Sequence, residues 1–230
     1  MKKIRQELKA MSEKNYHDFS ASLSPGFTYP MLGVRIPILR QIAKKMVKEN
    51  TWKYFCDEDP SDDYFEEILL RGFVIGYACL EWKEAKSRMG NYAGLVNNWA
   101  LCDCACSSFK IVRHYPEDAW IWLRDYLYSQ EEFPSRFGII MLLSHFINDA
   151  WIDRVLNIFT ELSPTAYYSR MALAWALSVC FVKYPEKVMP LLKNPVWDRE
   201  TYRKTLQKIL ESNRLHDEYR FMIRDLRDNI

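Results

Sequence analysis

The ten residues from Asn97 to Cys106, Asn-Asn-Trp-Ala-Leu-Cys-Asp-Cys-Ala-Cys, bring a carboxylate, an indole and three thiols into one short run. The run has no Gly or Pro and predicts a helix, with Trp99 and Asp103 four residues apart on one face. Cys102 and Cys106 form a second such pair, suited to packing inward. A carboxylate among hydrophobic neighbours needs a partner or a chemical role. In a site with little water it can stabilise developing positive charge and orient water, and an indole adds a cation–π attraction of about 0.5–2 kcal/mol.

Other catalytic arrangements are not indicated. The cysteines at positions 102, 104 and 106 have no histidine nearby, and none of the six cysteines forms Cys-x-x-Cys, so their spacing does not favour a zinc site. The four histidines are scattered, and the chain has neither a Gly-rich phosphate loop nor a Gly-x-Ser-x-Gly elbow. Trp99 and Asp103 therefore remain the strongest candidates for chemistry.

Composition predicts a folded, all-α protein. Of the 230 residues, 49% are hydrophobic and 15% aromatic, and only 7 are Gly, with few alternating Val, Ile and Thr runs. The net charge of +2 requires that any nucleic-acid surface be a local basic stripe. Cysteines in apolar runs, an N-terminus that soon turns polar and the lack of a long apolar run lead us to expect a cytoplasmic protein without a membrane segment.

A series of short helices is expected to position these side chains. Residues 2–11 and 13–23 predict two amphipathic helices, which we treat as an N-terminal helical pair over residues 2–24. A loop is expected over residues 25–30, which contain two Pro and one Gly. Gly33, shortly after it, is expected to permit an unusual backbone turn. Stacked helix pairs are expected from about residue 36 to residue 227, all within a single domain spanning residues 1–230.

Proline and acidic residues mark helix starts. Pro37 predicts a helix that runs to about Glu49, because the missing N–H of Pro costs nothing in the first turn. Asp63 with Glu66 resembles a capping box for a long helix through Leu80. Further prolines stand where a first helical turn would begin: Pro116, Pro134, Pro164 and Pro185.

A weak internal repeat is visible. Residues 136–143 align with residues 170–177 at an offset of 34. Steps of 32 to 34 residues connect Arg71, Asp103, Arg136, Arg170 and Arg203. Such spacing, filled by two helices each time, is typical of helix-pair solenoids. The array predicts that these five positions line one concave surface, basic except for a single acid.

Several motifs in this order resemble one family. The run Asn98-Trp99-Ala100-Leu101-Cys102-Asp103 resembles the Asn-Trp-Ala-Thr-Cys-Asp signature of the AlkD family of DNA alkylation repair proteins, which are HEAT-like helical repeat proteins. The other matching motifs are Gly33-Val34-Arg35-Ile36-Pro37 with Leu39-Arg40, then Arg136-Phe137-Gly138, and Ala174-Trp175. Together they extend over nearly the whole chain.

The resemblance implies excision of cationic alkylpurines, such as 3-methyladenine and 7-methylguanine, from double-stranded DNA without a metal or an organic cofactor. Breaking the glycosidic bond of such a base moves positive charge onto the sugar. The family's catalytic acid corresponds to Asp103, its two substrate-binding tryptophans to Trp99 and Trp175, and its phosphate-binding arginine to Arg136. Most glycosylases extrude the damaged base, whereas members of this family are understood to leave it largely in the duplex and to contact the deoxyribose.

Basic side chains near these motifs could follow a phosphate backbone. The block of residues 199–208 carries four cations in ten residues. The candidate backbone contacts are Arg35, Arg40, Arg170, Arg203, Lys204 and Lys208. The alternative for the C-terminal block is a solvated helix face, and Arg170 and Arg203 could instead lie over a neighbouring repeat. Of Glu66 and Glu67, we expect one to be a structural hydrogen-bond partner.

Three functions follow from these observations. The first is a monomeric DNA glycosylase in which Asp103 is essential. The second is a non-catalytic DNA-binding scaffold for unusual or branched DNA, because Trp99 is followed by Ala100 where active family members have a second Trp. The third is a protein-binding solenoid, which fits the nearly neutral net charge.

Overall fold

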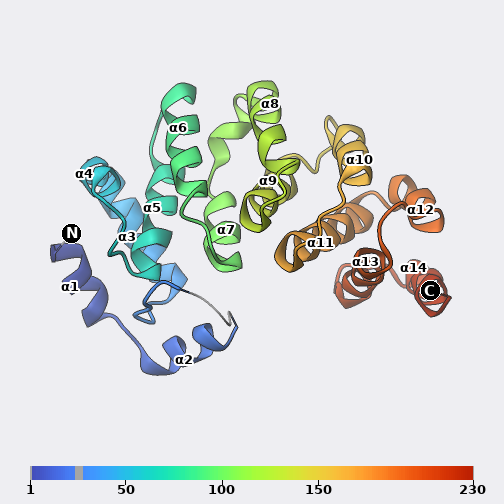
Figure 1. Cartoon of the computed structure of the whole chain (residues 1–230), viewed down its shortest axis with the longest axis horizontal. Helices are drawn as coiled ribbons and strands as arrows, with labels where there is room; N and C mark the ends of the chain where they lie inside the picture. The colour runs from blue at the N-terminus through green and yellow to red at the C-terminus, as the bar shows by residue number, and fades with distance from the viewer. Residues whose placement is uncertain (1, 24–27, 230) are drawn as a thin grey trace. The chain divides into compact units, whose positions relative to one another are not determined.

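The structure is a computed structural model that describes residues 2–23 and 28–229, and every regular element in these two ranges is a helix (Figure 1). The predicted all-α fold is therefore confirmed. Pro25 and Gly26 of the expected loop lie outside the described residues. The elements, in chain order, are α1 (Lys2–Ala10), α2 (Lys14–Ser22), α3 (Ile36–Lys48), α4 (Trp52–Asp57), α5 (Phe65–Tyr77), α6 (Trp82–Ala93), α7 (Trp99–Cys106), the 3-10 helix η1 (Lys110–Arg113), α8 (Pro116–Leu127), α9 (Glu132–His145), α10 (Ile152–Glu161), α11 (Tyr167–Lys183), α12 (Pro185–Lys193), α13 (Arg199–Glu211) and α14 (Asp217–Asp228).

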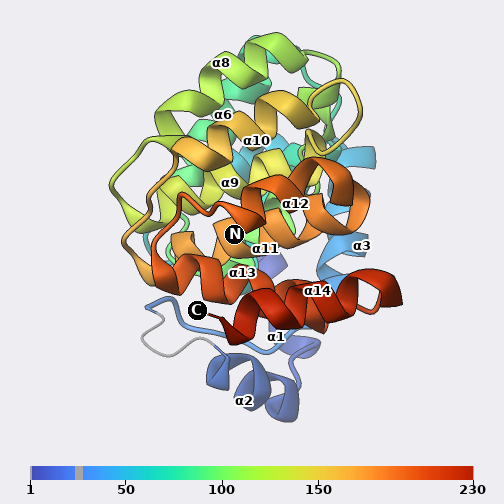
Figure 2. The ribbon, with the colours of Figure 1, turned by 90° about the vertical axis from the view of Figure 1, so that its right-hand side faces the viewer.

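The helices group into two compact units, Met1–Glu117 and Asp118–Ile230. In the first unit α3, α5 and α7 pack against one another in chain order, with α4 and α6 against the same row. In the second unit α9, α11 and α13 form a similar row, with α10 and α12 against α11 and α14 beside α13 (Figure 2). Each unit is thus a stack of helix pairs, as expected for a helical repeat array. The single domain over residues 1–230 stays a prediction.

Side-chain contacts inside the second unit repeat with the spacing expected from the sequence. The ammonium of Lys187 lies 2.5 Å from a carboxylate oxygen of Asp153, 34 residues earlier. The hydroxyl of Tyr219 donates a 2.9 Å hydrogen bond to Glu186, 33 residues earlier. Successive helix pairs therefore meet through equivalent positions, which is the physical basis of the repeat.

Helix α5 is the buried centre of the first unit. All of its residues from Phe65 to Ile75 are buried, including two glutamates and an arginine. At its end Gly76 allows close packing: a Cβ there would lie 2.6 Å from the Cβ of Ser108 and 2.8 Å from the Ser108 backbone. The helix ends at Tyr77 rather than at the predicted Leu80.

The turn before α3 depends on Glu66. The carboxylate of Glu66 accepts backbone hydrogen bonds from Leu32 (2.9 Å), Gly33 (2.7 Å) and Val34 (3.1 Å). Gly33 has a φ of +87°, a conformation that side chains with a Cβ rarely adopt, which confirms the unusual turn expected there.

The predicted capping box is wrong by one residue at each end. Glu67, not Glu66, accepts the N–H of the residue that precedes the helix, Tyr64, at 2.9 Å. Asp63 instead bonds the guanidinium of Arg71. The expectation that Glu66 or Glu67 is a structural hydrogen-bond partner is confirmed for both residues. Glu66 accepts N–H groups of the turn before α3, and Glu67 accepts the N–H of Tyr64 at the start of α5.

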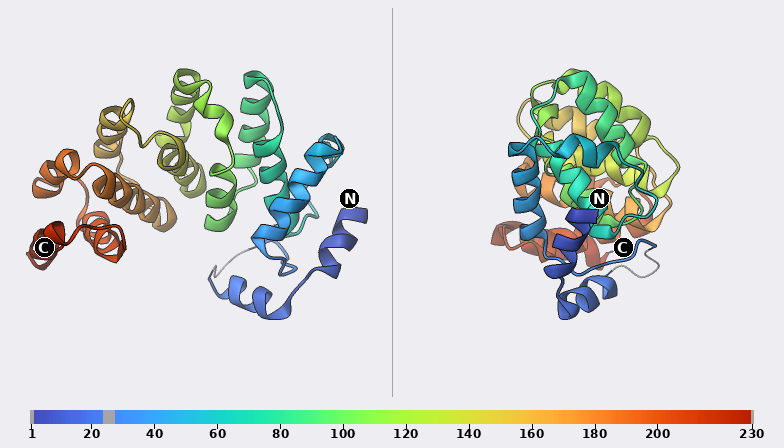
Figure 3. Two further views of the ribbon diagram at one scale, coloured as in Figure 1. Left: turned by 180° about the vertical axis from the view of Figure 1, so that it is seen from behind. Right: turned by 90° about the vertical axis from the view of Figure 1, so that its left-hand side faces the viewer.

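The N-terminal helices lie at the edge of the first unit (Figure 3). Leu8 of α1 is fully buried, whereas α2 has no buried residue and leaves Phe19 59% exposed. The guanidinium of Arg5 holds α1 to α5 by hydrogen bonds of 3.0 Å to Glu67. Polar contacts therefore supply much of the attachment of this helical pair.

Replacing Glu66 by Gln should lower the free energy of unfolding by about 2–3 kcal/mol, because an amide has one acceptor oxygen and loses charge-assisted bonds to buried N–H groups. Urea unfolding would measure the loss. Glu84→Gln is the matched control, since Glu84 makes a surface pair with Arg88, and should change stability by less than about 0.5 kcal/mol. Equal losses in the two variants would contradict the role assigned to Glu66.

Gly76→Ala should destabilise the protein by about 1–2 kcal/mol, because overpacking against the Ser108 backbone outweighs the helix propensity gained by Ala. Gly94→Ala is the control: Gly94 has a right-handed helical φ of −67°, and its Cβ would meet only the Asn91 carbonyl oxygen at 3.4 Å. Thermal unfolding should show a lowered midpoint for the first variant and an unchanged or raised midpoint for the second.

Candidate functional site

Helix α7 carries Trp99 and Asp103. Asn98 begins it by accepting the N–H of Ala100 on its side-chain oxygen at 2.7 Å. Leu101, Cys102, Ala105 and Cys106 are buried, whereas Trp99 and Asp103 are partly exposed. The predicted helix and its two faces are therefore confirmed: thiols pack into the core, and the carboxylate and indole share the opposite side.

The indole of Trp99 is oriented by the N-terminal helical pair. Its Nε1–H donates a 3.2 Å hydrogen bond to the carbonyl of Leu23, which follows α2. A second contact ties the start of α7 to the N-terminal part of the chain: the side-chain amide of Asn97 donates to the hydroxyl of Thr28 at 2.6 Å. The position of the indole beside Asp103 thus depends on a segment about 76 residues earlier in the chain.

Arg40 fixes the C-terminal end of α7. Its guanidinium donates to the Tyr77 hydroxyl (2.7 Å), the Ser108 hydroxyl (3.0 Å), the Cys104 carbonyl (3.2 Å) and the Ser107 hydroxyl (3.3 Å). It also lies 4.2 Å from the centre of the Phe73 ring. A cation at the end of a helix meets its unpaired carbonyls and the negative end of its dipole. The sequence showed no sign of this structural role, and the predicted contact of Arg40 with DNA stays a prediction.

Two further arginines of the first unit have acidic partners. Arg35 forms two 2.8 Å hydrogen bonds with Glu13 and lies over the Tyr16 ring. Arg71 is buried, and its Nε donates to Asp63 at 2.7 Å. The expectation that Arg71 lines a basic surface is therefore wrong, because a buried guanidinium requires an internal partner. Arg35 remains half exposed, and its predicted role at a DNA backbone stays a prediction.

In the second unit Arg136 lies inside the helix row. The residue is 5% exposed, and its Nη1 donates to the carbonyl of Tyr168 at 2.7 Å, joining α9 to the start of α11. The expectation that Arg136 lines a basic surface is therefore wrong, as it is for Arg71, and the phosphate contact assigned to Arg136 by resemblance remains a prediction. Trp99 and Asp103 belong to the first unit, whereas Arg136 and Trp175 belong to the second.

Trp175 is exposed rather than part of the core. It is 37% exposed and borders a groove of about 450 Å³ between α11 and α13. Lys208, Glu211, Asn213 and Arg214 line the same groove. An indole beside an amide and two cations, which outnumber the single carboxylate, suits a sugar–phosphate strand. Asn213 and Arg214 were not singled out from the sequence, because they lie in a turn without a motif.

The remaining predicted backbone contacts differ in their surroundings. Arg170 pairs with Glu200, and its Nε lies 3.9 Å from Asp198. Arg203 is exposed on α13. Lys204 donates a 3.4 Å hydrogen bond to the side chain of Gln207. Of the C-terminal cations, Arg203 and Lys208 are thus better placed for an external phosphate than Arg170.

Three of the cysteine thiols, those of Cys56, Cys104 and Cys180, are unsuited to ionise near neutral pH. Burial raises the pKa of Cys56 and of Cys104 to about 11, and that of Cys180 to about 12. A protonated thiol is neither a nucleophile nor a metal ligand. Among residues 2–23 and 28–229 no group of three or more His, Cys, Asp or Glu side chains could hold a metal ion. In the same ranges no helix is long and apolar enough to cross a bilayer.

These features define an all-helical repeat protein with an acid and an indole on one helix face and a second indole beside cations. The family whose sequence model matches the chain is described as "DNA alkylation repair enzyme", and the match covers residues 3–215. The chain therefore belongs to this family, and its role is in DNA alkylation repair with DNA as the substrate. Neither the search of curated proteins nor that of solved structures found a match.

Replacing Arg40 by Lys should lower the free energy of unfolding by about 2–4 kcal/mol, because an ammonium cannot reproduce the fork that joins four acceptors. Amide hydrogen exchange should also accelerate at the end of α7. Arg224→Lys, at an exposed position of α14, is the control and should alter stability by less than about 0.5 kcal/mol. Unchanged exchange at α7 in the Arg40 variant would contradict the positioning role.

Proposed function

We propose that this protein is a monomeric DNA glycosylase that excises cationic N-alkylpurines, such as 3-methyladenine and 7-methylguanine, from double-stranded DNA. The observation that carries the proposal is the placement of Asp103 and Trp99 on the partly exposed face of α7. The opposite face of this helix is packed into the core. A carboxylate held on a packed helix can act without reorganising when charge develops in front of it.

The reaction follows from the charge of the substrate. When the bond between C1′ and the purine nitrogen breaks, its electron pair goes to the cationic base, which leaves neutral. Positive charge then lies on the deoxyribose, where the carboxylate of Asp103 stabilises it and the indole of Trp99 adds cation–π attraction. Water attacks C1′ and gives up a proton to Asp103. The products are the free base and an abasic sugar.

Binding to the duplex would use contacts from each unit separately. In the second unit the exposed ring of Trp175 and the cations Lys208 and Arg203 would meet a sugar–phosphate strand, with Arg136 as the arginine assigned by resemblance. In the first unit Arg35 and Arg40 are the corresponding candidates. With a net charge of only +2, affinity must come from such local groups. A cytoplasmic location is part of the same proposal.

A second candidate is a non-catalytic scaffold that binds unusual or branched DNA. The observation in its favour is that Ala100 follows Trp99, so this helix presents a single indole beside Asp103. One indole gives less cation–π stabilisation of a sugar cation than two. The scaffold and the glycosylase both require DNA binding and differ in base release.

The decisive variant is Asp103→Asn. It should reduce release of 7-methylguanine from a duplex by about 100-fold or more, because the charge that stabilises the transition state is removed. Binding to undamaged duplex should be nearly unchanged. Asp62→Asn, an exposed position of the same unit, is the control and should retain full activity. Equal release by wild type and Asp103→Asn would refute the mechanism, and binding without release by wild type would favour the scaffold.

Lys208→Ala should weaken duplex binding at low salt and reduce the slope of log K against log[salt] by about 1, the value for one lost phosphate contact. Fluorescence anisotropy over a salt series would measure both. Lys86→Ala is the control, because Lys86 is exposed on α6 in the first unit. A Lys208 variant with the wild-type slope would remove this residue from the proposed DNA contacts.

A further inference from the structure

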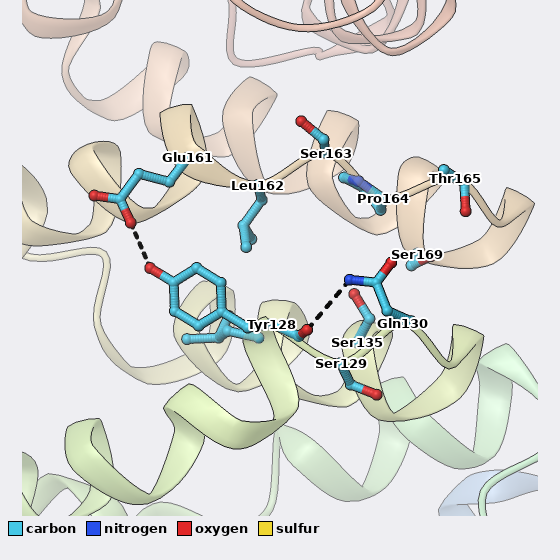
Figure 4. Close-up of a pocket in the computed structure, with 11 residues that line it drawn as sticks. Tyr128, Ser129, Gln130, Ser135, Glu161, Leu162, Ser163, Pro164, Thr165 and Ser169 are labelled. Atoms are coloured by element: carbon cyan, nitrogen blue, oxygen red, sulfur yellow. Dashed lines mark hydrogen bonds between the residues drawn. The ribbon is translucent and has the colours of Figure 1, made fainter.

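The second unit contains a cavity that the proposed DNA chemistry does not use. It has a volume of about 280 Å³ and lies where the turn between α8 and α9 meets the turn between α10 and α11 (Figure 4). One wall is made by residues 127–130 with Ser135, and the other by residues 161–165 with Ser169. Asp103, Trp99 and Trp175 are not among the lining residues.

The lining is rich in neutral hydrogen-bonding groups. Five of the lining residues are Ser or Thr, and Gln130 adds an amide. No Lys, Arg or His lines the cavity, and its one carboxylate, Glu161, accepts a hydrogen bond from the Tyr128 hydroxyl. A phosphate or carboxylate ligand would therefore meet a negative group and no cation. The chemistry of the walls favours a neutral ligand.

Ser135 and Ser169 bring two hydroxyl groups to the cavity from opposite walls. Ser135 is 4% exposed, and its hydroxyl can both donate and accept a hydrogen bond. On the facing wall Ser169 is 2% exposed and uses its hydroxyl to donate to the carbonyl of Ala166 at 3.1 Å, so its oxygen can still accept. Both hydroxyls can therefore exchange hydrogen bonds with hydroxyl groups of a ligand.

The ends of the helices do not make this an anion site. The N–H of Tyr168, in the first turn of α11, already donates to a carboxylate oxygen of Glu132 at 2.6 Å. The positive end of the α11 dipole is thus met from within the chain. Recognition in the cavity must come from its side chains.

The cavity also has apolar surface. In the view of Figure 4 the side chain of Leu162 projects between Tyr128 and Ser135, with Pro164 along the same wall. The ring of Tyr128 adds an aromatic face, and its hydroxyl donates a hydrogen bond to Glu161. A ring with hydroxyl groups at its edge and C–H bonds on its face matches this lining. Its hydroxyls can bond the hydroxyl, amide and carboxylate groups, and its C–H face can pack on the aromatic ring.

We propose that this cavity binds a neutral, polyhydroxylated small molecule about the size of one sugar ring. Ser135 and Ser169 exchange hydrogen bonds with ligand hydroxyls, Glu161 and Gln130 bond further hydroxyls at the rim, and the Tyr128 ring covers the apolar face of the ligand. The site is independent of base excision, because it shares no residue with the proposed catalytic face of α7.

The test is a titration of the full chain, labelled with ¹⁵N, with D-glucose and D-ribose, followed by amide chemical shifts. Inorganic phosphate and adenine form the two comparison arms. Saturable shifts confined to the amides around Ser135, Thr165 and Ser169 are expected with at least one sugar. Failure of both sugars to give saturable shifts there, or stronger binding of phosphate or adenine at these amides, would overturn the proposal.

Ser135→Ala and Glu161→Gln should each weaken sugar binding by about fivefold or more, the effect of one lost hydrogen bond. Ser178→Ala is the matched control, because Ser178 is also 4% exposed in the second unit and its hydroxyl donates to the Trp175 carbonyl. Glu161 is exposed, so its variant keeps the test valid should Ser135→Ala fail to fold. The assigned contacts would be refuted if Glu161→Gln kept wild-type affinity while Ser135→Ala either kept wild-type affinity or failed to fold.

Discussion

The guanidinium of Arg40 is the interaction on which the arrangement of the first unit depends. It reaches from α3 to Tyr77 at the end of α5 and to Cys104 and Ser108 at the end of α7, with hydrogen bonds of 2.7–3.2 Å. The planar fork of Arg can satisfy several acceptors at once, which the point charge of Lys cannot. Because Asp103 lies one residue before Cys104, the same contacts hold the acid in place.

The N-terminal helices connect to this arrangement mainly through polar contacts. Glu13 is bound by Arg35, and α2 contributes no buried side chain. The indole of Trp99 nevertheless takes its orientation from Leu23. Attachment by exposed ion pairs is weak and sensitive to salt, so the position of an indole beside Asp103 rests on one of the least buried parts of the fold.

The second unit shows how one helical array can provide two kinds of surface. The groove beside Trp175 is bordered by Lys208 and Arg214 with one carboxylate, Glu211, whereas the hydroxyl-lined cavity at Ser135 has a carboxylate and no cation. Both lie between successive helix pairs, where the side chains of turns and helix starts meet. Small changes of residue type at equivalent positions therefore change the chemistry of each surface without changing the helices.

Local pattern by itself determined the all-α class, the helix of Trp99 and Asp103 with its two faces, the turn at Gly33 and the spacing of the helix pairs, since these depend on residues close in the chain. Tertiary structure decided the rest. Arg40 and Arg35 read as free cations in the sequence, yet they bond Cys104 and Glu13, because a guanidinium takes the acceptors that folding brings within reach. Arg71 was expected at a surface and is buried against Asp63. Trp175, amid small apolar residues, is exposed, and Ser135 meets Ser169 across a cavity. Burial is set by which helices pack together, and periodicity within one helix does not contain that information.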